Sequence, residues 1–157
     1  MSETIGGSSA TGIQLDGSGN IFLSGYAADS DFPVTPDAIV ADSPIPSSVY
    51  DGSTSAFVVK INPSATAVEF STLLGGGNSE SDLGNAIALD SGGNVYVTGT
   101  AGGGFPVTAG VFQPTFPSGS PGNAFVSKLA LSPKVQNHYL SQTAVSASLP
   151  RLIRVLG

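Results

Sequence analysis

The chain contains an internal repeat, which limits the folds open to it more than any other feature. Three blocks of the first half return in the same order, 68 to 74 residues later. The matched blocks are 12–25 with 86–99, 32–35 with 105–108, and 56–61 with 124–129. Because the order is kept while the spacing drifts by a few residues, the halves are expected to be two copies of one structural unit whose loops differ in length.

Apolar and polar residues alternate within each block, which is typical of a β-strand with one buried face. Ile13 and Leu15 share one face and Gln14 lies on the other, and the second copy repeats this pattern. The first unit is expected to hold four strands, at about 13–16, 21–26, 57–61 and 68–74. No apolar stripe of helical spacing occurs before residue 130, so the fold class is all-β.

The composition agrees with a folded, turn-rich chain. Only 10% of the 157 residues are charged and 21 are glycine, but 40% are hydrophobic. Disordered chains combine low hydrophobicity with high net charge, so disorder is not expected here. No run of 18 apolar residues occurs, and no transmembrane helix is predicted. The absence of cysteine excludes disulfides and thiolate chemistry.

A loop framed by aspartate and asparagine joins the first two strands of each copy. The frames are Asp16 with Asn20 and Asp90 with Asn94. Asx side chains bond the local backbone and the intervening glycines supply positive φ, so tight hairpin turns are predicted. Calcium binding is the alternative, although Ca²⁺ takes 6–8 oxygen ligands and each loop offers one carboxylate and one amide.

Each copy also has a long loop between its second and third strands, at 27–55 and 101–122. Each loop carries the block Phe-Pro-Val-Thr, in which the proline forces its predecessor into an extended conformation. Phe32 and Phe105 are expected to be apolar plugs that pin these loops to the sheets.

Catalytic candidates are scarce. The only histidine, His138, lies outside the repeats, and there is no cysteine, so nucleophilic and zinc-assisted catalysis have no candidate residues. The pairs Asp29/Asp31 and Glu80/Asp82 are interpreted as solvated loop acids rather than a glycosidase pair. No catalytic residue, metal or cofactor is predicted.

The charge distribution excludes nucleic acid as a partner. All eleven acidic residues lie within 1–129, where Lys60 and Lys128 are the only bases, and such a surface repels phosphate backbones. The two lysines occupy the same repeat position and are expected to lie along a strand face, offsetting nearby acids. The glycine runs 75–77 and 102–104 lack the strand-to-helix context of a phosphate loop and are interpreted as turns.

The segments 89–99, 105–108 and 124–129 resemble the bacterial seven-bladed β-propeller repeat of the SBBP type. The resemblance covers residues 3–129 and implies two four-stranded antiparallel blades of an incomplete propeller, with a divergent C-terminal tail. It further implies a secreted or surface-attached protein whose partners are other propeller blades, in the same longer chain or in a homo-oligomer. It carries over no catalytic residues.

Three regions are therefore predicted. Residues 1–77 form the first blade with a preceding partial strand, 78–129 form a second blade lacking its fourth strand, and 130–157 are a divergent tail. Residues 2–7 echo the segment around Leu74, so they are expected to complete the second blade of a neighbouring copy, unless the chain forms part of a longer propeller. Two interpretations of the tail stay open, a poorly ordered end and a membrane-touching amphipathic segment.

The expected function is that of a non-enzymatic repeat module, an extracellular scaffold or binding domain for a glycan or protein ligand. The alternative is a carbohydrate-binding or lyase-like propeller whose site lies in the two long loops.

Overall fold

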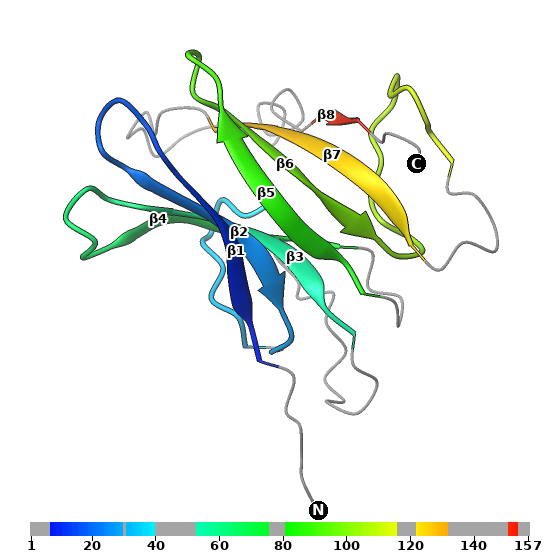
Figure 1. The fold of residues 1–157 in the computed structure, drawn as a ribbon, viewed down its shortest axis with the longest axis horizontal. Coiled ribbons are helices and arrows are strands. Elements are labelled where there is room, and N and C mark those ends of the chain that lie inside the picture. Colours follow the sequence, from blue (N-terminus) through cyan, green and yellow to red (C-terminus); the bar gives the residue numbers. More distant parts are fainter. Residues whose placement is uncertain are drawn as a thin grey trace, which may run out of the picture.

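The computed structural model describes residues 7–29, 31–39, 53–75, 81–115, 122–131 and 151–153. These residues form two antiparallel sheets, one from each copy of the repeat (Figure 1). The strands of the first sheet are β1 (Ser9–Leu15), β2 (Ile21–Ala27), β3 (Ser55–Ile61) and β4 (Val68–Leu74). Those of the second are β5 (Leu83–Leu89), β6 (Asn94–Ala101), β7 (Asn123–Ala130) and β8 (Arg151–Ile153). The predicted all-β fold of two propeller blades is confirmed.

Each sheet is a meander in which neighbours along the chain pair with one another. β1 and β5 each contain a bulge, where the register shifts between Ala10 and Gly12 and between Gly84 and Ala86. A bulge increases the local twist of a strand. Since both bulges lie at the same repeat position, the two sheets share their distortion as well as their strand order.

A glycine opposite an aromatic residue anchors the middle of each sheet. Gly25 on β2 pairs with Phe57 on β3, and Gly99 on β6 pairs with Phe125 on β7. A Cβ at Gly99 would lie 1.8 Å from the carbonyl oxygen of Leu83 and 2.9 Å from the ring of Phe125. Only glycine therefore lets the bulged first strand and the phenylalanine ring approach this position together.

The two loop phenylalanines stack on these rings. Phe32 lies 4.9 Å from Phe57, and Phe105 lies 4.4 Å from Phe125, measured between ring centroids. Phe105 is only 5% exposed. The prediction that Phe32 and Phe105 pin the long loops to the sheets is confirmed.

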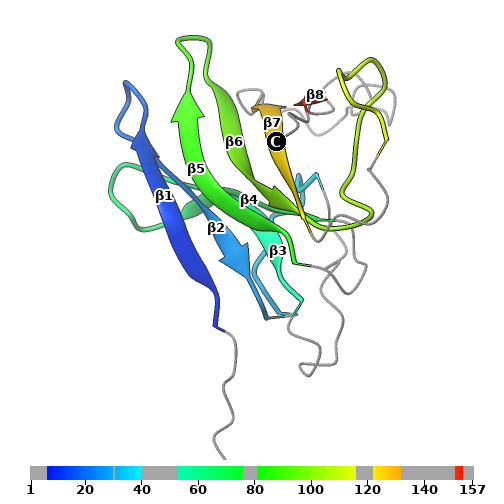
Figure 2. The same ribbon diagram turned by 45° about the vertical axis from the view of Figure 1, so that its right-hand side comes forward.

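One face of the first sheet packs on one face of the second. Their shared core contains Phe22, Ala56 and Val58 from the first sheet and Val95 and Leu129 from the second. β5 lies beside β1 and packs against both β1 and β2 (Figure 2). The hydroxyl of Thr11 on β1 donates a hydrogen bond to the carbonyl of Gly84 on β5. The sheets are thus stacked face to face with their first strands together, as neighbouring blades of a propeller are.

The second sheet differs from prediction at its outer edge. A fourth strand had been expected to be missing, but β8 pairs antiparallel with β7 from Val126 to Lys128. β8 has three residues against seven in β4, so it covers only part of that edge. The chain itself thus contributes a short strand where a neighbour's segment 2–7 had been expected. Residues 1–6, 132–150 and 154–157, which include most of that segment and of the tail, lie outside the described residues.

We expect Phe105→Ala to lower the free energy of unfolding by about 3–5 kcal/mol, because it removes a buried ring and leaves a cavity beside Phe125. Phe112 is the matched control, since it lies in the same loop but is 82% exposed. Its replacement by alanine should cost less than about 0.5 kcal/mol in the same urea titration. Equal losses would contradict the anchoring role of Phe105.

Candidate functional site

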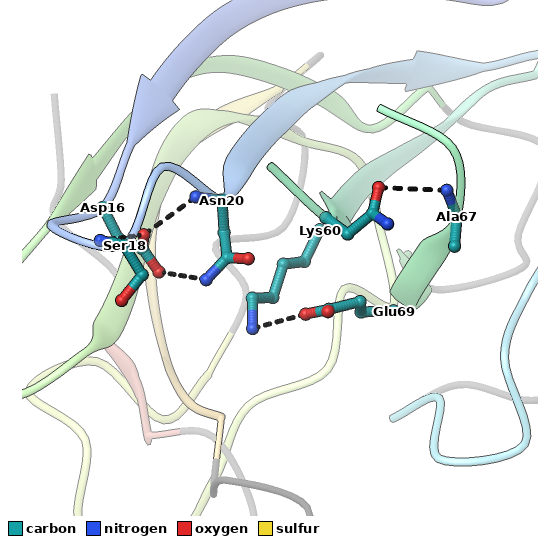
Figure 3. A network of polar contacts seen from close by, with 7 residues as sticks. Asp16, Ser18, Asn20, Lys60, Ala67 and Glu69 are labelled. Atoms are coloured by element: carbon teal, nitrogen blue, oxygen red, sulfur yellow. Dashed lines mark hydrogen bonds and ion pairs between the residues drawn. The ribbon is translucent and has the colours of Figure 1, made fainter. Parts of the chain in front are cut away.

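The first hairpin turn is organised around the carboxylate of Asp16. Its Oδ1 accepts hydrogen bonds from the backbone N–H groups of Ser18 (2.8 Å) and Asn20 (2.9 Å), and its Oδ2 accepts one from Asn20 Nδ2 (2.7 Å). Figure 3 shows Asp16 and Asn20 side by side across the turn. Gly19 has φ 82°, a conformation that favours glycine. The turn is thus a closed hydrogen-bonded frame.

The second hairpin turn repeats this frame. Asp90 Oδ1 accepts hydrogen bonds from the N–H groups of Gly92 and Asn94, both at 2.9 Å, and Oδ2 accepts one from Asn94 Nδ2 at 2.7 Å. The hydroxyl of Tyr96 is a fourth donor to this carboxylate and bonds Oδ2 at 3.0 Å. Gly93, at φ 77°, corresponds to Gly19. The same sequence frame therefore gives the same geometry in both copies.

These donors stabilise the ionised carboxylates. The side-chain hydrogen bond from Asn94 is the largest of the effects that lower the pKa of Asp90, which falls from 3.8 to about 2. The hydrogen bond from Asn20 likewise lowers the pKa of Asp16. Both groups are therefore held as anions by hydrogen bonds that the folded turn supplies.

The same bonds bear on the calcium alternative. In each frame both carboxylate oxygens already accept N–H groups of the turn itself. Among the residues that the structure describes, no three Asp, Glu or His side chains gather closely enough to hold a metal ion. The geometry is that of a turn whose carboxylate bonds to its own backbone.

The two lysines lie along the sheet faces as expected. Lys60 Nζ lies 2.7 Å from Glu69 Oε2, a contact visible in Figure 3, and 5.8 Å from the centre of the Phe22 ring. Lys128 Nζ lies 4.0 Å from Asp90 Oδ2 and 5.3 Å from the centre of the Tyr96 ring. Each lysine therefore pairs with an acid of its own sheet over an aromatic ring.

Sequence reasoning missed the turn between β3 and β4. Asn62 Oδ1 accepts hydrogen bonds from the N–H groups of Thr66 (2.8 Å) and Ala67 (3.1 Å), the latter drawn in Figure 3. Ala65 within this turn has φ 56°. The signal was the order Asn62-Pro63-Ser64, because asparagine and proline commonly start turns.

Asp82 corrects the interpretation of the acidic pairs, because it is a buried residue rather than a solvated loop acid. It is 2% exposed, and its Oδ1 accepts a hydrogen bond from the N–H of Gly102 (2.8 Å). Its own N–H donates to the carbonyl of Thr54 (2.8 Å). Asp82 thus ties the start of β3 in the first sheet to the end of β6 in the second.

The remaining candidates within the described residues do not come together as a site. Asp29 accepts a hydrogen bond from the hydroxyl of Ser8 (3.0 Å), and Asp31 is exposed. Gly104 lies in a turn with φ 77°, as interpreted for its glycine run. Glu80 and His138 lie outside the described residues. No helix long and apolar enough to cross a membrane occurs in the described part of the chain.

Two stacked four-stranded meanders with repeated turns and loop plugs are the architecture of tandem β-propeller blades. Residues 69–106 match the family model described as SBBP, Beta-propeller repeat. The resemblance predicted from the sequence is thereby confirmed for this segment, which runs from β4 through β5 and β6 to the Phe105 plug. A search of curated proteins gave no match.

We expect Asn94→Ala to lower the melting temperature by several degrees, because it removes the side-chain hydrogen bond to Asp90. Ser91→Ala is the matched control in the same exposed turn and should change it by about one degree or less. Thermal melts followed by circular dichroism measure both. Equal shifts would remove the special role of the Asp/Asn frame.

We also expect acid to destabilise the fold partly through Asp90. Because its folded-state pKa is about 2 and its ordinary value is 3.8, its contribution is present above about pH 4 and is lost as the pH falls towards 2. Asp90→Asn should therefore show a smaller loss of stability than the native chain between pH 5 and pH 2. Parallel curves in urea titrations across this range would contradict the assignment, and Ser91→Ala should follow the native curve.

Proposed function

We propose that the chain is a non-enzymatic β-propeller repeat module that acts as an extracellular scaffold or binding domain. Its description as a β-propeller repeat module rests on the fold and on the family match over residues 69–106. The scaffold or binding role is the further step.

The observation that supports a scaffold role is the use of polar side chains within the described residues. Asp16 and Asp90 accept hydrogen bonds from their own turns, and Lys60 pairs with Glu69 on the next strand. Asp82 is buried between the sheets and bonds to Gly102. These are the residue types that catalysis normally recruits, and each has a structural partner.

An extracellular or cell-surface location is supported by the family resemblance. The resemblance implies tandem blades in secreted or surface-attached bacterial proteins. Antibody labelling of intact, unpermeabilised cells tests this part of the proposal, and labelling that appears only after permeabilisation would contradict it.

One observation favours the alternative, a carbohydrate-binding or lyase-like propeller. Phe112 lies in the 101–122 loop with 82% of its surface exposed, and Val107 of the same loop is also exposed. An exposed aromatic ring offers a flat apolar face against which the C–H groups of a sugar ring can pack. Loops carried by a rigid scaffold are frequent ligand sites.

A glycan array probed with the native chain and with Phe112→Ala separates the two functions. For a scaffold that binds no glycan, we expect no specific, saturable signal with either protein. Saturable binding by the native chain that is lost in Phe112→Ala, with an unchanged melting temperature, would establish the carbohydrate-binding alternative. Cleavage of a bound polysaccharide would extend it to a lyase-like or hydrolytic enzyme.

A further inference from the structure

The contact between the two sheets shows which face of this repeat packs on which. The first sheet presents Ala56, Val58 and Phe22, all buried, to the second sheet. The second sheet presents the opposite face, on which Val95 and Leu129 are a register pair. The contact is therefore heterologous, because it joins two different faces of one repeated unit.

The first sheet carries a partly uncovered copy of the face that the second sheet packs against it: Phe57 and Val59 lie beneath the loop residue Phe32, but the part formed by β1 is exposed. Ile13 is 64% exposed and Leu15 is 56% exposed. Their repeat equivalents, 74 residues later, are Ile87 and Leu89, which pack against the core shared by the two sheets. The outer face of the first sheet is thus a docking face without its partner sheet among the described residues.

The first sheet buries one of its faces against the second sheet. The equivalent face of the second sheet points away from the first sheet and is exposed. Ala124 is exposed, whereas its equivalent Ala56 is fully buried. Thr98 is also exposed, whereas its equivalent Ser24 is fully buried. Both differences have the same cause, because Ala56 and Ser24 face a neighbouring sheet and their counterparts do not.

We propose that two copies of this chain dock head to tail. The outer face of the first sheet in one copy, which carries Ile13 and Leu15, packs on the outer face of the second sheet in the other copy, which carries Thr98 and Ala124. Each copy necessarily carries both halves of the contact, and the internal contact shows how the equivalent faces of the two sheets pack on each other. Ile13, Leu15, Thr98 and Ala124 are uncharged, and Lys128 on the same face as Ala124 lies 4.0 Å from Asp90, so docking leaves no unpaired charge among these residues. This inference deepens the proposed scaffold role by naming the partner.

The internal contact also indicates which residues meet between copies. A Cβ built at Gly12 lies 3.2 Å from Ile87 Cγ2 across the two sheets. The equivalents of Gly12 and Ile87 are Ala86 and Ile13. Ala86 of one copy therefore contacts Ile13 of the next.

A heterologous contact either closes into a ring or extends into a filament. Propellers have about 4–8 blades, so rings of two, three or four copies would fall within the known range. Sedimentation velocity over a range of concentrations measures the mass. We expect masses of two or more copies, and a folded monomer at every concentration would overturn the proposal.

Face-blocking variants test the heterologous geometry. Ile13→Asp blocks one face and Ala124→Arg blocks the other, and each should raise the apparent dissociation constant by about tenfold or more. Since each variant keeps the face that the other has lost, their mixture should form a 1:1 dimer and nothing larger. A mixture that stays monomeric, or variants that assemble like the native chain, would overturn it.

The control variant is Ser91→Ala, which alters an exposed turn residue and should leave assembly unchanged. Circular dichroism of each variant distinguishes lost docking from lost folding. A variant that unfolds is replaced by the milder Leu15→Gln or Thr98→Lys on the same face.

Cross-linking tests the register, because the native chain has no cysteine. Ala86→Cys and Ile13→Cys, mixed in a glutathione redox buffer, should give a mixed disulfide in excess of either homodimer. Ser91→Cys, in an exposed turn, should not cross-link to Ile13→Cys. Equal cross-linking of both would contradict the register. These results are independent of the glycan array, so failure of docking and failure of the scaffold role are distinguishable.

Discussion

The stack of a loop phenylalanine on a strand phenylalanine, set over a glycine, holds each unit together. Phe105 rests on Phe125, whose ring contacts the space above Gly99. This stack joins the second strand, the third strand and the long loop between them in one contact. In the second unit it also places a buried ring between the sheets, since Phe105 belongs to their shared core, whereas Phe57 and Phe32 of the first unit form a separate cluster. In the second unit the same three residues therefore contribute to loop closure, strand pairing and sheet stacking.

The two sheets pack on each other through apolar side chains, but at the start of the second sheet they are also joined by hydrogen bonds of Asp82. Asp82 accepts the N–H of Gly102, and at the same repeat position in the first sheet the hydroxyl of Ser8 accepts the N–H of Ala28 (3.3 Å). A buried carboxylate is costly unless hydrogen bonds compensate it. The buried Asp82 lies where the chain passes from the first sheet to the second. Ser8, which is shorter and more exposed, lies at the start of the first described sheet.

Sequence patterns predicted most of the fold because they reflect local physics. Alternation placed β2 and β4 almost to the residue, and the Asp16/Asn20 frame predicted a turn that bonds to itself. The failures have a different origin. The burial of Asp82 depends on a sheet contact that no local pattern encodes, and the short β8 pairs with β7 across a long sequence separation. Neither follows from alternation or turn composition.

The segment that matches the family begins in the last strand of one sheet and ends in the loop plug of the next. The bounds of the matched segment therefore differ from the bounds of a sheet. The segment contains the whole stretch of chain that joins the two sheets, including Asp82. A whole sheet with its junction corresponds to the longer internal repeat of 68 to 74 residues, so a duplication of that length would add one sheet together with its junction. A change in repeat number can then change the number of stacked sheets without requiring any new contact to evolve.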